Sequence, residues 1–283
     1  MTNAFSIDLE DYFHPTEVGS RIADWSNFRP RIEVGTDFLL DLLAQHHTRA
    51  TFFILGWVAG RHPGLVRRIA AAGHEIGCHS YFHRLVYDLT PAEFRQDTCR
   101  AVSAIEDACG RSPKLYRAPS YSIVAKSLWA LDILAELGFT HDSSIYPIVH
   151  DRYGVPDSPR HAHKIDTPSG SILEVPIATV RVLKNQTAPI GGGAYLRLFP
   201  YRYVAAGIRR LNRLEGQPAC IYTHPWELDP DQARITRGFV SAVRTYGGLG
   251  SMRRKMNRMF QEFNFGALGD VYPCGVRRAE ALV

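Results

Sequence analysis

The sequence predicts an α/β fold with a largely parallel sheet. Short apolar runs rich in β-branched and aromatic residues alternate along the chain with stretches whose apolar residues recur at helical spacing. Several polar residues that are candidates for chemistry come directly after the predicted strands. In a parallel barrel, catalytic groups gather at the carboxyl ends of the strands. We therefore expect a site at that end of the sheet.

The first half of the chain carries regular strand and helix signals. The apolar run at residues 4–9 ends in acids, so we expect a strand that delivers Asp8 to its carboxyl end. Apolar residues at helical spacing predict a helix over residues 32–45. The next elements are a buried strand at 50–55 closed by Gly56, a helix at 63–72 that starts with Pro63, and a short strand at 74–78 that runs into His79.

The middle of the chain contains a strong helix signal. Thr90 and Glu93 have the spacing of a capping box, and Gly110 is expected to end the helix that follows. The further predictions are a short strand at 115–116, a helix at 125–137, strands at 172–183 and 219–223, and a long structured loop near the site at 187–203, where three consecutive glycines and several aromatic residues break the pattern.

The alternation stops at residue 229. We expect one domain over residues 1–283, with a core over about 4–228 and a helical C-terminal extension over about 229–283. An apolar stripe at helical spacing marks a helix in this extension, and its members are Met252, Met256, Met259, Phe260 and Phe263. We interpret the stripe as packing against the rest of the domain. Contact with an anionic membrane is the alternative.

Composition excludes several classes of protein. The chain has 283 residues, of which 45% are hydrophobic and 22% charged, so it can bury a sizeable core. The net charge is +5, but no long Lys/Arg run or aromatic–basic repeat supports nucleic-acid binding, and we interpret the basic residues as a solvated surface. The five cysteines are odd in number and form no C-x-x-C, which argues against a disulfide framework and a cysteine-based zinc site.

Targeting signals are missing from the sequence. The N-terminus has no basic region followed by an apolar stretch, and no run approaches the length of a membrane span. We therefore expect a cytoplasmic protein, with a membrane surface as a less favoured partner. The sequence gives no indication of the oligomeric state.

The strongest chemical signal is the pair His79 and His83. Two imidazoles at this spacing can face one metal ion if the backbone turns helically between them. The acidic cluster at the end of the first strand contains Asp8, Glu10 and Asp11. One of these carboxylates would complete a two-histidine, one-carboxylate metal site, and another would act as general base. Taken alone, the cluster is equally typical of solvated acids or of a helix cap.

Two later segments add candidates. Arg117 follows a predicted strand and could hold a carboxylate base ionised, while Ser120, after Pro119, keeps a backbone N–H that could stabilise an oxyanion. His224 follows the strand at 219–223, where it could donate a proton to a leaving amine. The alternatives are a surface turn for Arg117 and a buried structural histidine at position 224. The order of these signals and their places at strand ends favour a catalytic site.

This order resembles the NodB-homology family, also called carbohydrate esterase family 4 or polysaccharide deacetylases. The segments at 49–56 and 73–83 resemble two of its strands, Arg117-Ala-Pro its third motif and the His224 strand its last. Within the family, the segments at 6–13, 142–147, 191–197 and 222–227 look most like deacetylases encoded with exosortase and exopolysaccharide loci. The resemblance covers about residues 4–227, and it implies a distorted (β/α) barrel with fewer than eight strands.

The resemblance also implies the role of each residue. Asp8 would be the base, His79 and His83 the metal ligands, Arg117 the residue that orients the base, and His224 the acid. The family's first motif usually has two adjacent aspartates, the second being a ligand, but here Leu9 follows Asp8. Glu10 and Asp11 therefore both stay candidates for the carboxylate ligand. The metal is expected to be Zn²⁺, although the ligand set also suits Co²⁺ or Ni²⁺.

The expected function is removal of an N-acetyl group from an amino sugar by metal-assisted hydrolysis. Asp142 is a further candidate, either for tuning His224 or for contacting sugar hydroxyls, and Tyr121, Tyr195 and Trp226 are candidates for lining a sugar cleft. One alternative is hydrolysis of a cyclic amide or ureide on the same fold. A second is a non-catalytic sugar-binding protein.

Overall fold

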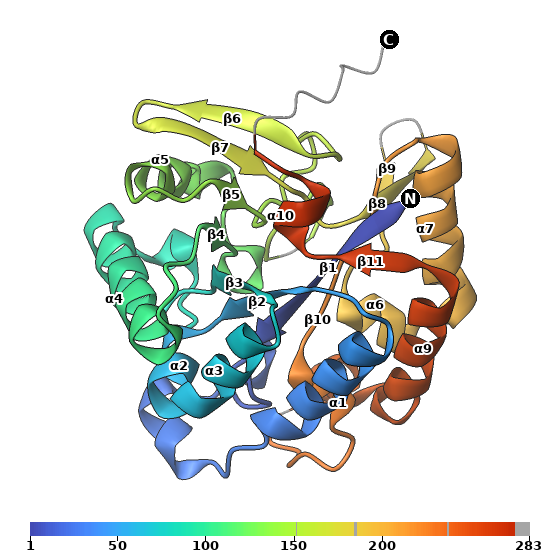
Figure 1. The fold of residues 1–283 in the computed structure, drawn as a ribbon, viewed down its shortest axis with the longest axis horizontal. Coiled ribbons are helices and arrows are strands. Elements are labelled where there is room, and N and C mark those ends of the chain that lie inside the picture. Colours follow the sequence, from blue (N-terminus) through green and yellow to red (C-terminus); the bar gives the residue numbers. More distant parts are fainter. Residues whose placement is uncertain (151, 184–185, 237, 275–283) are drawn as a thin grey trace.

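Strand β1 (Thr2–Leu9) belongs to a nine-stranded sheet, in which it pairs with three other strands (Figure 1). A computed structural model describes residues 1–150, 152–183, 186–236 and 238–274. Within these residues, one continuous run of the sheet is parallel, and in spatial order its strands are β10 (Cys220–Thr223), β1, β2 (Thr51–Ile54), β3 (Glu75–Cys78), β4 (Leu115–Tyr116), β5 (His141–Asp142) and β7 (Gly170–Glu174). Strand β6 (His163–Thr167) adds an antiparallel edge. The prediction of a largely parallel α/β fold is confirmed.

The sheet curls into a distorted barrel with a seam between β10 and β7. Two backbone hydrogen bonds bridge this seam through irregular chain: Ala178 N–H donates to Cys220 O over 3.0 Å, and Tyr222 N–H donates to Gly191 O over 2.8 Å. A small two-stranded sheet, β8 (Thr179–Leu183) and β9 (Gln186–Pro189), lies beside the seam. The expected barrel with fewer than eight strands corresponds to the parallel run, which β6 and β11 (Asn264–Gly266) extend.

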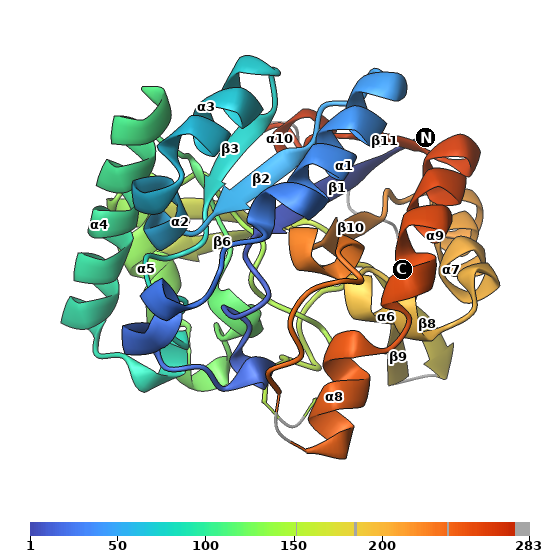
Figure 2. The same ribbon diagram turned by 90° about the horizontal axis from the view of Figure 1, so that it is seen from below.

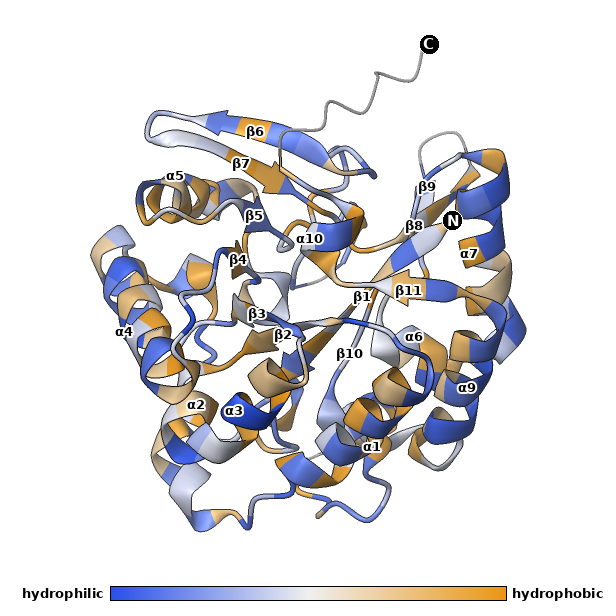
Figure 3. Ribbon diagram, in the orientation of Figure 1, coloured by the Kyte–Doolittle hydropathy of each residue, from blue (hydrophilic) through white to orange (hydrophobic). Residues whose placement is uncertain are grey.

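Helices surround the sheet on its outer side (Figures 1 and 2). Their hydropathy alternates around each axis, while the central strands are largely apolar (Figure 3), because the helices bury one face and the strands bury both. Thr90 and Glu93 form the predicted capping box. The helices of the first half are α1 (Ile32–Gln45), α2 (Gly56–Arg61), α3 (Pro63–Ala71), α4 (Pro91–Cys109) and α5 (Trp129–Glu136).

Short 3₁₀ turns link several of these elements. The helix predicted at 125–137 is such a turn followed by α5. Helix α2 is not predicted by the sequence, because Gly56 there indicates only the end of a strand. The 3₁₀ helices are η1 (Thr16–Val18), η2 (Ile22–Asn27), η3 (Val86–Asp88), η4 (Pro119–Tyr121), η5 (Ala125–Ser127) and η6 (Pro225–Leu228).

Two predictions in the second half of the chain were wrong. The strand expected at 172–183 is split between β7 and β8, which lie in different sheets, because Pro176 has no N–H to continue a ladder. The loop expected at 187–203 contains helix α6 (Gly193–Leu198) and the start of helix α7 (Tyr201–Leu214). The glycines that suggested a loop lie at the start of α6, where Glu227 comes too close to Gly193 for any side chain.

The C-terminal region is mainly helical, as expected. Its elements are α8 (Phe239–Tyr246), α9 (Leu249–Glu262), β11 (Asn264–Gly266) and α10 (Leu268–Val271). Strand β11 was not predicted, and it pairs in parallel with β1, so this region extends the same sheet. Met252, Met256 and Met259 on α9 are fully buried, which confirms that the apolar stripe packs in the core. Among the described residues, no helix is both long and apolar enough to cross a membrane.

Candidate metal centre and active site

The register of the sheet brings the predicted site residues to one edge. Leu9 at the end of β1 pairs with Ile54, Ile54 pairs with Cys78, and Cys78 pairs with Tyr116. The residues that follow these strands therefore emerge side by side, and they include Glu10, His79 and Arg117. On the other side of β1, Ile7 pairs with Thr223, which places His224 at the same edge.

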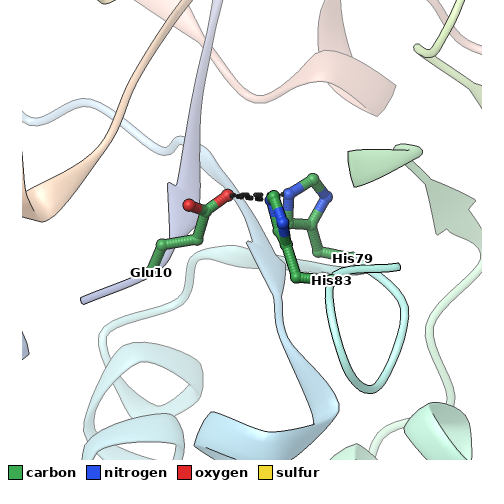
Figure 4. Close-up of side chains that lie close together, drawn as sticks. All are labelled: Glu10, His79 and His83. Atoms are coloured by element: carbon green, nitrogen blue, oxygen red, sulfur yellow. Dashed lines mark hydrogen bonds and ion pairs between the residues drawn. The ribbon is translucent and has the colours of Figure 1, made fainter. Parts of the chain in front are cut away.

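Glu10, His79 and His83 form a buried cluster (Figure 4). The Oε1 atom of Glu10 lies 2.9 Å from Nε2 of His79 and 3.0 Å from Nε2 of His83. All three side chains are almost completely buried. Burial raises the pKa of Glu10, but the neighbouring imidazoles, above all that of His83, outweigh it and hold this pKa well below its usual value.

The two histidines are brought together by a loop, and the helical turn considered from their spacing is not formed. Ser80 and His83 both have left-handed backbone angles, with φ of 60° and 55°. The loop is held from both sides, because Gly56 N–H donates to Ser80 O and Tyr81 N–H donates to the carboxylate of Asp97. Left-handed residues other than glycine are costly, and such strain is typical of functional sites.

The donor set of this cluster fits a divalent cation. Nδ1 of His79 lies 2.7 Å from the carbonyl oxygen of Arg117, so this nitrogen carries the proton. When Nε2 of His79 carries no proton, its lone pair faces Oε1 of Glu10, which is itself an acceptor. The other oxygen of Glu10, Oε2, is buried and has no hydrogen-bond partner among the described residues. Acceptors that converge in this way are satisfied by a cation, and two histidines with one carboxylate suit Zn²⁺.

Asp11 lies outside this cluster. Its carboxylate accepts hydrogen bonds from the backbone N–H groups of Tyr12, Arg31 and Ile32, and so it caps the start of α1. Burial raises the pKa of Asp11 to about 6. Of the two carboxylates left open by the sequence, the structure brings Glu10 to the histidines and uses Asp11 as a helix cap.

Asp8 is held by a buried arginine. Arg117 Nη1 donates to Asp8 Oδ1 over 2.7 Å and to the Ser6 hydroxyl, while Nε and Nη2 donate to the carbonyl and hydroxyl oxygens of Ser143. Burial lowers the pKa of Arg117, but the charge of Asp8 outweighs it and raises this pKa, so the guanidinium stays charged. Its carbon also lies 4.2 Å from the centre of the Phe53 ring. The expected orienting contact between Arg117 and Asp8 is therefore present.

Ser120 lies in a strained turn on the wall of the site. Ser120 and Tyr121 have φ of 49° and 54°, and their backbone amides therefore follow each other around a tight left-handed turn. The Ser120 hydroxyl contacts the Thr16 hydroxyl at 3.0 Å, which fixes the turn against η1. Two successive residues other than glycine with left-handed backbone angles are unusual and energetically costly. This strain is consistent with a backbone N–H that is held in place for function.

His224 faces Asp8 and Glu10 from across the edge of the sheet. Its Nε2 lies 3.9 Å from Asp8 Oδ2 and 3.9 Å from Glu10 Oε1, and its Nδ1 lies 3.1 Å from Glu227 Oε2. Burial lowers the pKa of His224, but the charges of Glu10 and Glu227 outweigh it and raise this pKa to about 9. His224 is therefore protonated at neutral pH, as a general acid must be.

Glu227 and Arg197 are functional candidates that the sequence analysis did not assign. Arg197 Nε donates to Glu227 Oε1 over 2.7 Å, and both side chains are 1% exposed. Burial raises the pKa of Glu227, but Arg197 and His224 lower it to about 2. The spacing of His224 and Glu227 around Pro225 is that of a helix start, which η6 confirms. Arg197 comes from α6, and no local pattern indicated it.

Asp142 does not take the role considered for it. Its Oδ1 accepts a hydrogen bond from Ser144, and its neighbour is the buried carboxyl of Glu174. Burial raises the pKa of both carboxyls. The carboxylate that contacts His224 is that of Glu227.

A cavity of about 310 Å³ opens above these residues. Asp8, Glu10, His79, His83 and His224 lie at its base, and Ser120 lies on its wall. Aromatic rings form much of the remaining lining, as expected of a sugar cleft, and they belong to Tyr121, Tyr153, Tyr195, Tyr222 and Trp226. The three aromatic residues considered from the sequence are therefore all at the cavity.

Two known families match consecutive parts of the chain. The family described as polysaccharide deacetylase matches residues 30–141, and a family described as a domain of unknown function (DUF3473) matches residues 143–273. His79, His83 and Arg117 lie in the first region and His224 in the second, while Asp8 and Glu10 precede both. The site is thus assembled from three stretches of the chain.

Three curated relatives are named as deacetylases. A chitooligosaccharide deacetylase of Bradyrhizobium sp. is 39% identical over 101 residues, which are 35% of this chain and 43% of that protein. A peptidoglycan-N-acetylglucosamine deacetylase of Bacillus cereus is 37% identical over 98 residues, 34% of this chain and 36% of that protein. A chitin deacetylase of Colletotrichum lindemuthianum is 38% identical over 92 residues, 31% of this chain and 37% of that protein. The chain therefore spans less than half the length of each.

Solved structures agree on the fold. A presumed polysaccharide deacetylase from Mycobacterium smegmatis superposes with a TM-score of 0.60 at 21% identity, covering 98% of this chain and 94% of that one. Puue allantoinase superposes with a TM-score of 0.59 at 15% identity, covering 95% and 87%. At such low identities these likenesses show the fold alone, and that fold hosts more than one named activity.

Proposed function

Because the chain carries a domain of the polysaccharide deacetylase (NodB, carbohydrate esterase 4) family, we propose that it is a metal-dependent hydrolase that removes an N-acetyl group from an amino-sugar unit of a poly- or oligosaccharide or glycoside. The observation that carries the proposal is the position of Glu10 Oε1 within 3.0 Å of Nε2 of both His79 and His83, in a buried cluster. Asp8 and His224 lie beside this cluster. The contact of Asp8 with Arg117 and the contact of His224 with Glu227 suit these two residues to proton transfer.

Glu10, His79 and His83 would hold the metal, which we propose is Zn²⁺, with Co²⁺ or Ni²⁺ as other ions that suit these ligands. When bound, the metal supplies Lewis acidity toward the acetyl carbonyl and toward water. His79 is suited to this role because its Nδ1–H is fixed by the carbonyl of Arg117, which leaves Nε2 free to bind. Asp11 is not proposed as a ligand, because its oxygens are bound by backbone N–H groups.

Asp8 would act as the general base. Its Oδ1 is tied to Arg117, while Oδ2 faces the cavity on the side of His224. Arg117 favours the ionised carboxylate and fixes its direction. Asp8 then takes a proton from the water whose oxygen forms a bond to the acetyl carbon, and the Ser120 N–H stabilises the charge that develops on the carbonyl oxygen.

His224 would act as the general acid. It is charged at neutral pH, and Glu227 holds its Nδ1 so that Nε2 points toward the reacting groups. As the bond between the acetyl carbon and the sugar nitrogen breaks, His224 gives its proton to that nitrogen. The products are acetate and the free amino sugar, and the proton held by Asp8 balances the one that His224 gave.

The test is acetate release from a panel of N-acetylated sugars, before and after removal of metal by a chelator and after addition of Zn²⁺ or Co²⁺. Chelator-sensitive release that the metal restores supports the proposal. The same panel includes cyclic amides, because the likeness to an allantoinase keeps hydrolysis of a cyclic amide or ureide as the alternative. No release from any substrate, together with no bound metal, would instead favour the sugar-binding alternative.

The substrate, the domain organisation and the cellular location of the protein stay predictions. We propose an N-acetylated carbohydrate as substrate because the named relatives act on chitooligosaccharide, peptidoglycan N-acetylglucosamine and chitin. The single-domain organisation, with a core followed by a helical extension, and the cytoplasmic location both remain as proposed from the sequence.

A further inference from the structure

Helix α8 exposes its apolar face and turns its polar face toward the protein. Phe239, Val240 and Val243 are 83%, 64% and 44% exposed, and their spacing places them on one face of the helix. The opposite face carries hydroxyl residues and turns them inward: Thr245 is buried, and the Ser241 hydroxyl donates to the carbonyl oxygen of Glu17. A helix that packs on its own domain normally buries its apolar face instead.

Helix α8 lies next to the cavity. Arg244 and Thr245 of α8 line the cavity, and so does Leu198, which is 42% exposed and contacts the backbone at Gly247. Figure 2 shows α8 at the lower edge of the molecule, apart from the helices that cover the sheet. A surface that binds α8 would therefore lie close to the cavity.

The charge of this part of the chain favours an anionic partner. Residues 232–250, which include α8, contain no Asp or Glu and three basic residues, Arg234, Arg237 and Arg244. Arg244 follows Val243 on the exposed side of α8, and its side chain makes no ion pair with any residue in the described part of the chain. Apolar side chains flanked by arginine are typical of helices that lie in a lipid headgroup layer.

The position of α8 is fixed by the active site. Arg197, which holds Glu227, also donates to the carbonyl oxygens of Arg244 (2.8 Å) and Gly247 (2.5 Å) at the end of α8. One buried guanidinium thus joins the surface helix to the carboxylate that contacts His224. These contacts of Arg197 therefore fix the orientation of the apolar face of α8 relative to the cavity.

From these observations we propose that α8 docks the protein on an anionic lipid bilayer, with the mouth of the cavity facing the membrane surface. Phe239, Val240 and Val243 enter the headgroup layer, and Arg244 contacts lipid phosphate. A second copy of the chain is the less suitable occupant, because these side chains expose an area on the order of a few hundred Å², below the ~800 Å² per partner that a stable interface buries. If the proposed deacetylase function holds, an amino sugar attached to a lipid would be presented to the cavity.

Vesicle binding of the full chain tests the proposal without any substrate. Wild-type protein is expected to sediment with vesicles that contain phosphatidylglycerol and much less with pure phosphatidylcholine, and added salt should weaken the binding. Phe239→Asp and Val243→Asp should each reduce binding about tenfold. Arg244→Gln should weaken binding to phosphatidylglycerol and reduce its dependence on salt. Leu214→Asp is the matched control, because Leu214 is 79% exposed at the end of α7.

Several outcomes would overturn the proposal. These are absence of vesicle binding, equal binding by Phe239→Asp, or an equal loss in Leu214→Asp. Self-association in analytical ultracentrifugation that Phe239→Asp abolishes would assign the face to a second copy. Circular dichroism establishes that each variant is folded. Acetate release from a soluble substrate, where found, should be unchanged in Phe239→Asp, so a failed docking proposal and a failed deacetylase proposal give different results.

Discussion

Nδ1 of His224 lies 3.1 Å from Oε2 of Glu227, and Arg197 holds the other oxygen of that carboxylate at 2.7 Å. The three side chains lie in a row, in which each charged group contacts a group of opposite charge. The arrangement fixes the ring of His224 and keeps it protonated, while leaving its Nε2 directed toward Asp8 and Glu10. Glu227, three positions further along the chain, and Arg197, from α6, thus prepare His224 as a proton donor.

Replacing Glu227 tests this arrangement. Glu227→Gln should lower the pKa of His224 and reduce kcat by about ten- to a hundredfold, because the ring loses its anionic partner and its fixed orientation. The rate should then fall at a lower pH than in the wild-type enzyme. The measurement is kcat against pH, with Glu262→Gln, a change in a surface carboxylate, as control. An unchanged pH profile would remove Glu227 from this role.

Unfolding of the metal-free protein should depend on pH through the same residues. The pKa of His224 is raised from 6.5 to about 9, so its stabilisation is fully present below pH 6.5 and is lost as the pH rises through 9. The free energy of unfolding should fall by about 3 kcal/mol across this range. Urea titrations at several pH values measure it. The fall should be smaller in Glu227→Gln, and an equal fall in both proteins would contradict the assignment.

Substitution of the two candidate carboxylates separates their roles. Glu10→Ala should abolish metal binding, because it removes the oxygen that both imidazoles face. Asp11→Ala should keep the metal but destabilise the protein by about 1 kcal/mol or more, because it removes the cap of α1. Metal content by mass spectrometry and urea unfolding give the two readouts. Loss of metal in Asp11→Ala with metal kept in Glu10→Ala would reverse the assignment.

Arg117 is expected to be irreplaceable by lysine. Lysine lacks the fork that reaches Asp8, Ser6 and Ser143 together, so Arg117→Lys should misplace the base and lower kcat by about a hundredfold. Metal content should stay near that of the wild-type protein, since Arg117 touches the cluster only through its backbone carbonyl. Activity close to that of the wild-type protein would show that Asp8 needs no such partner.

The buried stripe of α9 gives a test of the core. Met256→Ala should destabilise the protein by about 2 to 5 kcal/mol, because Met256 is fully buried and alanine leaves a cavity. Arg254→Ala, a change between the stripe residues, should have little effect by comparison. Thermal unfolding compares the two variants. Equal and small effects would mean that α9 is not part of the cooperative core.

Most strands and helices of the first half were predictable because their signals are local. Helix α1 begins and ends as expected, and the capping box of α4 is formed by four consecutive residues. In the second half, local signals were misleading. Pro176 interrupts a run that otherwise reads as one strand, and the glycines before α6 look like a loop although they allow close packing against Glu227.

For the site, the sequence by itself determined which residue types stand at the strand ends. Asp8, His79, His83, Arg117 and His224 were all named from their order and from the strands that precede them, and the sheet register brings them to one edge. Parallel pairing makes this prediction possible, because strands in register deliver their following residues to the same place.

Only the tertiary structure decided between Glu10 and Asp11, and only it showed Arg197, Glu227 and the outward apolar face of α8. These depend on contacts between segments far apart in the chain: Asp11 is bound by the start of α1, and Arg197 joins α6 to η6 and to the end of α8. A sequence pattern shows the spacing of apolar residues within one helix or strand and the residues next to it in the chain. The direction of a side chain is set by its packing partners, and these become known only when the chain is folded.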